Sequence, residues 1–200
     1  MHIYAIGDLH LSGEPPTKPM EIFGEHWRGH KEKIRQHWLE TVKADDTVII
    51  CGDISWAMSL EEAAQDLDWL ARLPGRKLLL RGNHDYWWTS LAKMQKRFGE
   101  HFEFLQNGCI MVGDIAVCGT RGWPFDDVAA QGEKLMAREA GRLRMSLQAA
   151  GDTAEKIAFL HYPPIYPGAQ AQELVDVLNE FGVTECYYGH LHGKSIRYAT

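Results

Sequence analysis

Five short apolar runs in this sequence each end in polar residues, and this repeated succession most constrains how the chain can fold. In chain order, the runs are followed by Asp8-Leu9-His10, Gly52-Asp53, Gly82-Asn83-His84-Asp85, His161 and Gly189-His190-Leu191-His192. The carboxyl ends of parallel strands converge on one edge of an open α/β sheet, where binding sites form. We therefore expect these clusters, which are far apart in the sequence, to meet at one edge.

Strand-like runs alternate with helical patterns in the first hundred residues, which indicates parallel β-α-β units. We expect strands at 2–6, 47–51, 77–81, 102–105, 109–112, 115–119, 156–161, 185–188 and 195–199. We expect helices at 25–43, 60–73, 89–98, 129–149 and 171–181. Ser59 and Glu62 form a capping box before the second helix, and the Gly113-Asp114 link predicts a hairpin. Periodicity thus favours a mixed α/β protein and leaves open whether it has one sheet or two.

Composition narrows the class of protein. With 200 residues, of which 45% are hydrophobic and 24% charged, residues 1–200 are expected to form a single domain. The net charge of -6 disfavours a non-specific nucleic-acid binder. The four cysteines lie in apolar runs without C-x-x-C spacing, so we interpret them as buried free thiols. The sequence starts in a strand-like run and has no apolar stretch of the ~20 residues that a membrane helix needs, so we expect a soluble, cytoplasmic protein.

The polar clusters contain the residue types of a metal site. Imidazoles mixed with carboxylates suit zinc, manganese or iron, whereas a magnesium site would be mainly oxygen. Any one cluster alone is more often turn or surface chemistry, and His161 alone would more often be a core histidine. Together they offer too many ligands for one tetrahedral ion, and they fit two ions bridged by one aspartate. Asp8 and His10, two residues apart in extended chain, are expected to point to the same side, as are His190 and His192.

The ordered clusters resemble the calcineurin-like metallophosphoesterase family from residue 7 to residue 193. This resemblance implies two mixed β-sheets packed as a sandwich and flanked by helices. It implies two divalent metal ions of Mn, Fe, Zn or Ni type. One ion would be held by Asp8, His10 and His192, Asp53 would bridge to the second, and Asn83, His161 and His190 would complete the second site. His84 would act as proton donor or phosphate ligand, oriented by Asp85.

By this resemblance the chain is expected to be a metal-dependent phosphohydrolase that cleaves phosphomonoesters or phosphodiesters with a hydroxide bridging the two metals. Its partner would be its substrate, a small-molecule or nucleotide phosphoester, and no membrane is expected as a partner. One alternative is a scaffold of the same fold that binds proteins, but such scaffolds tend to lose histidine ligands, and here every ligand position is filled. The other alternative, a nuclease on DNA or RNA, is disfavoured by the acidic pI near 5.9.

The sequence departs from one branch of the family. Ile54-Ser55-Trp56 follows Gly52-Asp53 in place of the Val-Asp-Arg that resembles protein serine/threonine phosphatases, so a protein phosphatase is not expected. Arg81 and Arg121 are candidates to replace the missing arginine, although no motif supports either position. Substrate choice is assigned to loops 12–30, 54–60 and 121–133. Four tryptophans near the clusters fit either an aromatic wall or, as we favour, ordinary packing: Trp56, Trp87, Trp88 and Trp123. 

Overall fold

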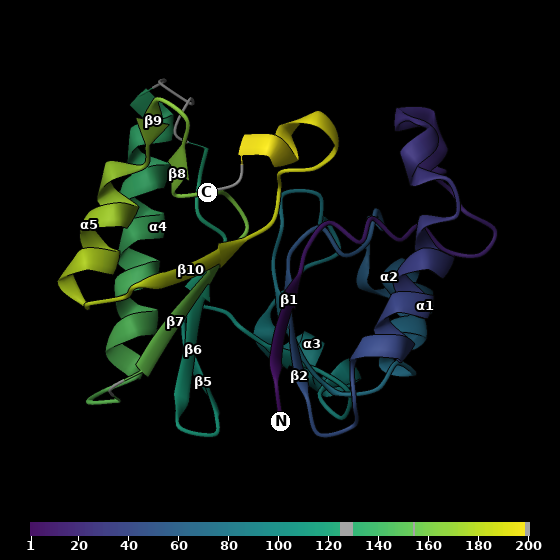
Figure 1. Cartoon of the computed structure of the whole chain (residues 1–200), viewed down its shortest axis with the longest axis horizontal. Helices are drawn as coiled ribbons and strands as arrows, with labels where there is room; N and C mark the ends of the chain where they lie inside the picture. The colour runs from purple at the N-terminus through teal and green to yellow at the C-terminus, as the bar shows by residue number, and fades with distance from the viewer. Residues whose placement is uncertain (125–129, 154, 199–200) are drawn as a thin grey trace.

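The computed structural model describes residues 1–124, 130–153 and 155–198. Two β-sheets pack face to face at the centre, and helices cover the outer face of each sheet (Figure 1). The expected sandwich is therefore confirmed, and the question of one sheet or two, which periodicity left open, is answered.

The first sheet contains the N-terminal strands and is parallel throughout its described pairings. Its order is β1 (Ile3–Ile6), β2 (Thr47–Cys51), β3 (Arg76–Leu80) and β4 (Glu103–Phe104). Its outer face is covered by α1 (His30–Thr41), α2 (Leu60–Ala71) and α3 (Leu91–Phe98). The Ser59 hydroxyl accepts a hydrogen bond from Glu62 N, while the Glu62 carboxylate reaches Met58 N, one residue earlier than an ideal capping box.

The second sheet is mixed, and its one antiparallel pair is the predicted hairpin. Its order is β10 (Glu185–Tyr188), β7 (Glu155–Leu160), β6 (Ile115–Thr120) and β5 (Cys109–Val112). Gly113 turns the hairpin with a φ of 61°, in the left-handed region that glycine adopts without penalty. Helices α4 (Ala130–Ala149) and α5 (Gln172–Glu180) cover its outer face (Figure 1). A small two-stranded sheet, β8 (Ile165–Tyr166) with β9 (Ala169–Gln170), was not expected.

Strand alternation explains why the central strands are apolar on both faces. In β2, Val48 and Ile50 pack toward the helices of the first sheet, whereas Ile49 and Cys51 pack into the layer between the sheets. Ala158 and Phe159 of β7 divide in the same way between the outer and the central layer. A strand buried on both sides reads as a continuous apolar run, which made these strands easy to predict.

Two expected elements were wrong. The helix expected at 25–43 is divided, because Gly29 adopts a left-handed conformation between the 3-10 helix η2 (Glu25–Trp27) and α1. A further 3-10 helix, η1 (Met20–Phe23), precedes η2.

The strand expected at 195–199 is instead the 3-10 helix η3 (Gly193–Tyr198), with residue 199 outside the described residues. There the Ser195 hydroxyl and backbone N–H both donate to the carbonyl oxygen of His192, a local turn that competes with strand formation. Residue 129 of the expected helix 129–149 also lies outside the described residues.

Two expectations from composition can be compared with the structure. All four cysteines are free, with Cys51 and Cys118 buried and Cys109 and Cys186 half-buried. Within residues 1–124, 130–153 and 155–198, no helix has the length and apolar character needed to cross a bilayer.

Candidate metal centre

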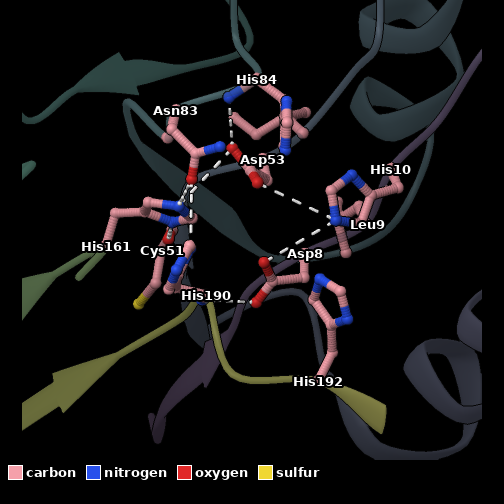
Figure 2. Close-up of polar contacts among 12 residues, drawn as sticks. Asp8, Leu9, His10, Cys51, Asp53, Asn83, His84, His161, His190 and His192 are labelled. Atoms are coloured by element: carbon pink, nitrogen blue, oxygen red, sulfur yellow. Dashed lines mark hydrogen bonds and ion pairs between the residues drawn. The ribbon is translucent and has the colours of Figure 1, made fainter. Parts of the chain in front are cut away.

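The polar clusters meet at one edge, where the carboxyl ends of β1, β2 and β3 face those of β7 and β10 (Figures 1 and 2). Figure 2 shows the imidazoles and the Asn83 amide gathered around the carboxylates of Asp8 and Asp53. The residues that the sequence singled out thus come together, although Asp8 and His190 are 182 positions apart and are joined by a hydrogen bond from His190 N to Asp8 Oδ2 of 2.8 Å.

Glycines allow the strand ends to come this close. A Cβ atom at Gly7 would lie 3.0 Å from Gly189 Cα, and one at Gly52 would lie 2.6 Å from Gly82 Cα. The first pair joins β1 to β10 and the second joins β2 to β3. A side chain at either contact would force the two strand ends apart, so these glycines set the width of the site.

The ligand candidates sit on an unusual backbone. Asp8, His10, Asp53 and His190 have φ values of 58°, 45°, 53° and 70°, and they are four of the five described non-glycine residues with positive φ. This conformation costs about 1–2 kcal/mol per residue, and such strain gathers at functional sites. It also corrects the expectation that Asp8 and His10 converge by alternating in extended chain.

Backbone hydrogen bonds hold this strained segment in place. Asp8 N donates to Gly52 O at 3.0 Å, and His10 N donates to Asp53 O at 2.9 Å. Leu11 pairs with Ser55 as an isolated parallel bridge. The loops after β1 and β2 are therefore fastened to each other, which fixes Asp8, His10 and Asp53 relative to one another.

The side chains form two groups of potential metal ligands that share Asp8. In each group the ligand atoms lie within 4.8 Å of one another: Asp8, His10 and His192 form one, and Asp8, Asp53 and His161 form the other. His10 Nε2 lies 3.8 Å from Asp8 Oδ1 and 3.9 Å from Asp53 Oδ2, too far for a hydrogen bond. Ligands that each lie about 2.0–2.2 Å from one ion are roughly 3–4 Å apart, so this spacing suits an ion between them.

The surroundings of His161 point to a cation. His161 Nδ1 lies 2.9 Å from the carbonyl oxygen of Cys51, which can only accept, so Nδ1 carries the proton of the neutral ring. The other ring nitrogen, Nε2, then presents a lone pair to Asn83 Oδ1 at 2.7 Å and to Asp53 Oδ1 at 3.6 Å. His190 Nδ1 is 3.1 Å from the same Asn83 oxygen. The lone pair of His161 Nε2 and the two oxygens that face it form a site that a positive ion would stabilise.

Several buried polar atoms of the site lack a hydrogen bond. Within the described residues, Asp8 Oδ1, both ring nitrogens of His10, and His84 Nδ1 have no partner. Buried polar atoms in native proteins nearly always have one, so each exception needs an explanation. Coordination of a metal would account for Asp8 Oδ1 and for one of the two His10 nitrogens, which belong to a common ligand group.

Burial controls the protonation of the site. It raises the pKa of Asp8 to about 7 and that of Asp53 to about 8, with the nearby charge of Asp85 acting in the same direction. It lowers the pKa of His10 and that of His161 to about 3. The imidazoles are thus neutral, as metal ligands must be, and the carboxylates pay a desolvation cost that a nearby cation would offset.

Asp85 has a different role from the one expected. Its carboxylate accepts hydrogen bonds from the backbone N–H groups of Gly82, Asp53, Ile54 and Ser55 and from the indole of Trp87, at 2.7–3.2 Å. No hydrogen bond joins it to the His84 ring in the described part of the chain. The expected orientation of His84 by Asp85 is therefore corrected: Asp85 ties the loop after β2 to the loop after β3 and positions Asp53 and His84 through their backbone.

An aromatic shell around the site was only partly anticipated. Trp56 stacks on His10 with ring centroids 4.9 Å apart and contacts His84 at 4.2 Å. Trp27 contacts His192 at 5.4 Å, and Lys18 Nζ lies 3.1 Å from the centre of the Trp56 ring. Lys18 and Trp27 fall in the loop 12–30 to which substrate choice was assigned, but no pattern singled them out.

The other tryptophans pack against the cores of the two sheets. Trp87 and Trp88 are buried in the first-sheet core, as the favoured packing interpretation held. Trp123 packs half-buried against the second-sheet core, and the Arg121 guanidinium lies 4.9 Å from its ring.

The fold and the donor set define a class: an α/β sandwich with an aspartate–histidine metal site at the shared strand ends. Within that class, the chain belongs to the calcineurin-like phosphoesterase family, whose model matches residues 1–194.

Similar proteins add little about function. The chain is 36% identical over 78 residues to the Gene 66 protein of Mycobacterium phage L5, covering 39% of this chain and 37% of that protein. It is 33% identical over 86 residues to the Gene 66 protein of Mycobacterium phage D29, covering 42% and 40%. The match thus spans about two fifths of the length of these relatives. A solved structure of a protein of unknown function from Aquifex aeolicus aligns over 93% of this chain and 88% of that one, with 19% identity and a TM-score of 0.47.

Proposed function

We propose that this protein is a phosphohydrolase that holds two divalent metal ions in the cluster at the shared strand ends. The observation that supports this most is the group of facing polar atoms: His161 Nε2 lies 2.7 Å from Asn83 Oδ1 and 3.6 Å from Asp53 Oδ1, around one small space. Family membership supports the metal-dependent phosphoesterase class. Residues 1–200 would act as one catalytic unit.

The ligands divide into two sets. One ion would be held by Asp8, His10 and His192. The other ion would be held by Asn83, His161 and His190, and Asp53 would bridge the two ions. Asp8 stands in both ligand groups, so it is the second candidate for a bridging carboxylate. Ions held there would activate a water molecule for attack on phosphorus and offset the charge of the phosphoryl oxygens. The identity of the ions, of Mn, Fe, Zn or Ni type, follows only from the mixed nitrogen and oxygen donors.

His84 is the residue of this chain best placed to assist the leaving group. Its backbone N–H donates to Asp53 Oδ1 at 2.8 Å, which ties the residue to the metal ligands, and its ring packs on Trp56. Burial and then the charge of Lys18 lower the pKa of His84, so the ring is neutral near pH 7 and can donate one N–H hydrogen bond to the leaving oxygen. A neutral ring stabilises the leaving oxygen as a hydrogen-bond donor, whereas protonation of that oxygen by His84 would need the imidazolium form.

The substrate we propose is a small-molecule or nucleotide phosphoester, a monoester or a diester. The net charge of -6 disfavours nucleic acid as the substrate. A scaffold role is disfavoured because a scaffold has no need for neutral buried imidazoles around two aspartates.

The direct test is hydrolysis of p-nitrophenyl phosphate and bis-p-nitrophenyl phosphate by the Mn²⁺-supplied protein. Asp53→Asn is expected to lower kcat by about 100-fold or more, comparable to loss of a preorganised charge in other active sites. Asp45→Asn is the matched control, because the Asp45 side chain is 70% exposed beside the N-terminus. Equal activity in both variants, or no activity of the wild type on either ester with Mn²⁺ bound, would reject the proposal.

A further inference from the structure

A second, strongly cationic cavity lies next to the metal centre, where β3 and β6 end. It has a volume of about 110 Å³, and its charged lining consists of Arg81, Arg121, Arg142 and Glu139. Three guanidinium groups and one carboxylate therefore share a space equal to only a few water molecules, at about 30 Å³ each.

The Glu139 carboxylate already has hydrogen-bond and ion-pair partners within the protein. Glu139 is buried, and its oxygens accept hydrogen bonds from the Thr120 hydroxyl at 2.6 Å and from Gly122 N at 3.2 Å, and pair with Arg142. Arg81 and Arg121 have no ion pair with a carboxylate within the described ranges, and Arg121 lies over the Trp123 ring. Two of the three positive charges are thus not balanced by the described lining of the cavity.

The nearby positive charges also affect the pKa of Arg81. Burial lowers the pKa of Arg81 and the positive charges of Arg121 and Arg142 lower it further, while the carboxylates of Asp85 and Glu139 raise it. An arginine stays protonated in spite of such a shift. Arg81 and Arg142 are partly open to solvent, and an anion that entered the cavity would reduce the remaining repulsion among the guanidinium groups.

The cavity adjoins the metal centre through the backbone. Arg121 O accepts hydrogen bonds from His161 N at 3.1 Å and Tyr162 N at 3.0 Å, so Arg121 stands beside the proposed ligand His161 on the neighbouring strand. Neighbouring strands are about 4.8 Å apart. Arg81 lies two residues before Asn83 at the end of β3. The strands β6 and β7 end side by side at the edge where the metal centre lies (Figure 1).

We propose that this arginine cavity, formed by Arg81, Arg121 and Arg142, binds a phosphate-like oxyanion, and that the anion is a second phosphate group of the substrate. The second part rests on the proposed function. Guanidinium groups match the oxygens of phosphate with paired, charge-assisted hydrogen bonds. The small volume admits one such group and excludes a nucleobase. The preferred substrates would then be bisphosphates, with one phosphate at the metals and the other among the arginines.

The first arm of the test measures binding without metal. Inorganic phosphate is titrated by calorimetry into the EDTA-treated full chain, where two buried aspartates make the metal centre unfavourable for an anion. Arg121→Gln and Arg81→Gln are each expected to weaken binding about tenfold or more, since each removes a charged donor pair. Arg138→Gln, which removes the same charge from an exposed position on α4 outside the cavity lining, is expected to change it less than twofold. No binding by the wild type, or equal weakening in all three variants, would overturn the oxyanion site.

The second arm identifies the source of the oxyanion. Adenosine 3′,5′-bisphosphate and adenosine 5′-monophosphate, which differ by one phosphate, are compared as substrates of the Mn²⁺-loaded protein. Arg121→Gln is expected to raise KM about tenfold for the bisphosphate and less than twofold for the monophosphate, with kcat unchanged. Equal changes for both substrates would overturn the substrate assignment and leave a site for free oxyanion. If neither nucleotide is hydrolysed, the p-nitrophenyl esters decide the proposed function separately, and calorimetry of both nucleotides decides whether the arginines discriminate them.

Discussion

Asn83 Oδ1 lies 2.7 Å from His161 Nε2, while the opposite nitrogen of the same ring faces the carbonyl oxygen of Cys51. A neutral imidazole has one proton, and it cannot donate in both directions. A metal ion at the open side of this pair, as proposed, would stabilise it. The relationship joins the end of β3 in the first sheet to the end of β7 in the second.

The metal-free protein should lose stability as pH rises from 6.5 to 8.5. The pKa of Asp8 is raised to about 7 and that of Asp53 to about 8, so the folded state keeps protons that the unfolded chain has already released. Stability from such groups is lost as pH rises through the folded-state values. We expect the free energy of unfolding to fall by roughly 2–3 kcal/mol over this interval, at 1.36 kcal/mol per pKa unit, as measured by urea unfolding in EDTA.

The range from pH 6.5 to 8.5 is chosen because, below pH 6.5, His10 and His161 change the stability in the opposite direction. Their pKa values are lowered to about 3, so they stabilise the fold above pH 6.5 and lose that contribution as pH falls. The double variant Asp8→Asn, Asp53→Asn is the control and should no longer lose stability between pH 6.5 and 8.5. A wild-type stability that rises between pH 6.5 and 8.5 would contradict this account of the buried carboxyl groups.

Asp85→Asn should destabilise the protein as well as inactivate it. Asp85 Oδ2 accepts from Gly82 N and Asp53 N, and an amide NH2 in its place would leave both donors unpaired. At about 1–3 kcal/mol for each buried donor, the expected loss is about 2–6 kcal/mol, measured by urea unfolding. Asp68→Asn, at an exposed position of α2, should change stability by less than about 0.5 kcal/mol. If both variants unfolded at the same urea concentration, the positioning role of Asp85 would be wrong.

Gly82→Ala should abolish metal binding by displacing Asp53. A Cβ atom at Gly82 would lie 2.1 Å from Asp53 Oδ1 and 2.2 Å from Asp53 N, so the carboxylate or the strand end must move. We expect Mn²⁺ affinity, measured by calorimetry, to fall by about 100-fold or more, since the loss of an oriented ligand environment costs at least 10–100-fold.

Gly141→Ala is the matched control for this steric test. Nothing lies within 4 Å of a Cβ atom at Gly141, which is in α4, so alanine should stabilise the helix by about 0.5–1 kcal/mol and leave Mn²⁺ affinity unchanged. Normal Mn²⁺ binding by Gly82→Ala would show that the contact between Gly82 and Asp53 does not matter for the site.

Much of the fold was predictable because the central strands are buried on both faces. The runs at β2, β3 and β7 are apolar throughout, so their ends, and the polar residues that follow, could be found from the sequence. The segment after His192 was not predictable, because polar and apolar residues alternate from Ser195 to Tyr198 as in a strand, while Ser195 closes a local turn. The alternation of strands and helices predicted the parallel pairing of the first sheet, whereas the resemblance implied that both sheets are mixed; the first sheet is parallel throughout its described pairings.

The site was predictable in its members but not in its geometry. Asp8 and His10 were found as a D-x-H pair, yet they converge through left-handed backbone conformations, which no periodicity encodes. Asp85 was found beside His84, but its hydrogen bonds go to backbone N–H groups that become neighbours only in the folded chain. Trp27 was missed because it fell within the helix expected at 25–43, and only the folded chain brings it against His192.

The measurement that tests the central claim most directly is the metal content of the protein after equilibration with Mn²⁺ and removal of the free ion. Elemental analysis is predicted to find two Mn²⁺ per wild-type chain and at most one after His161→Ala, because His161, Asn83 and Asp53 face the same small space. Retention of the wild-type metal content by His161→Ala, or no bound Mn²⁺ in the wild type, would contradict the account.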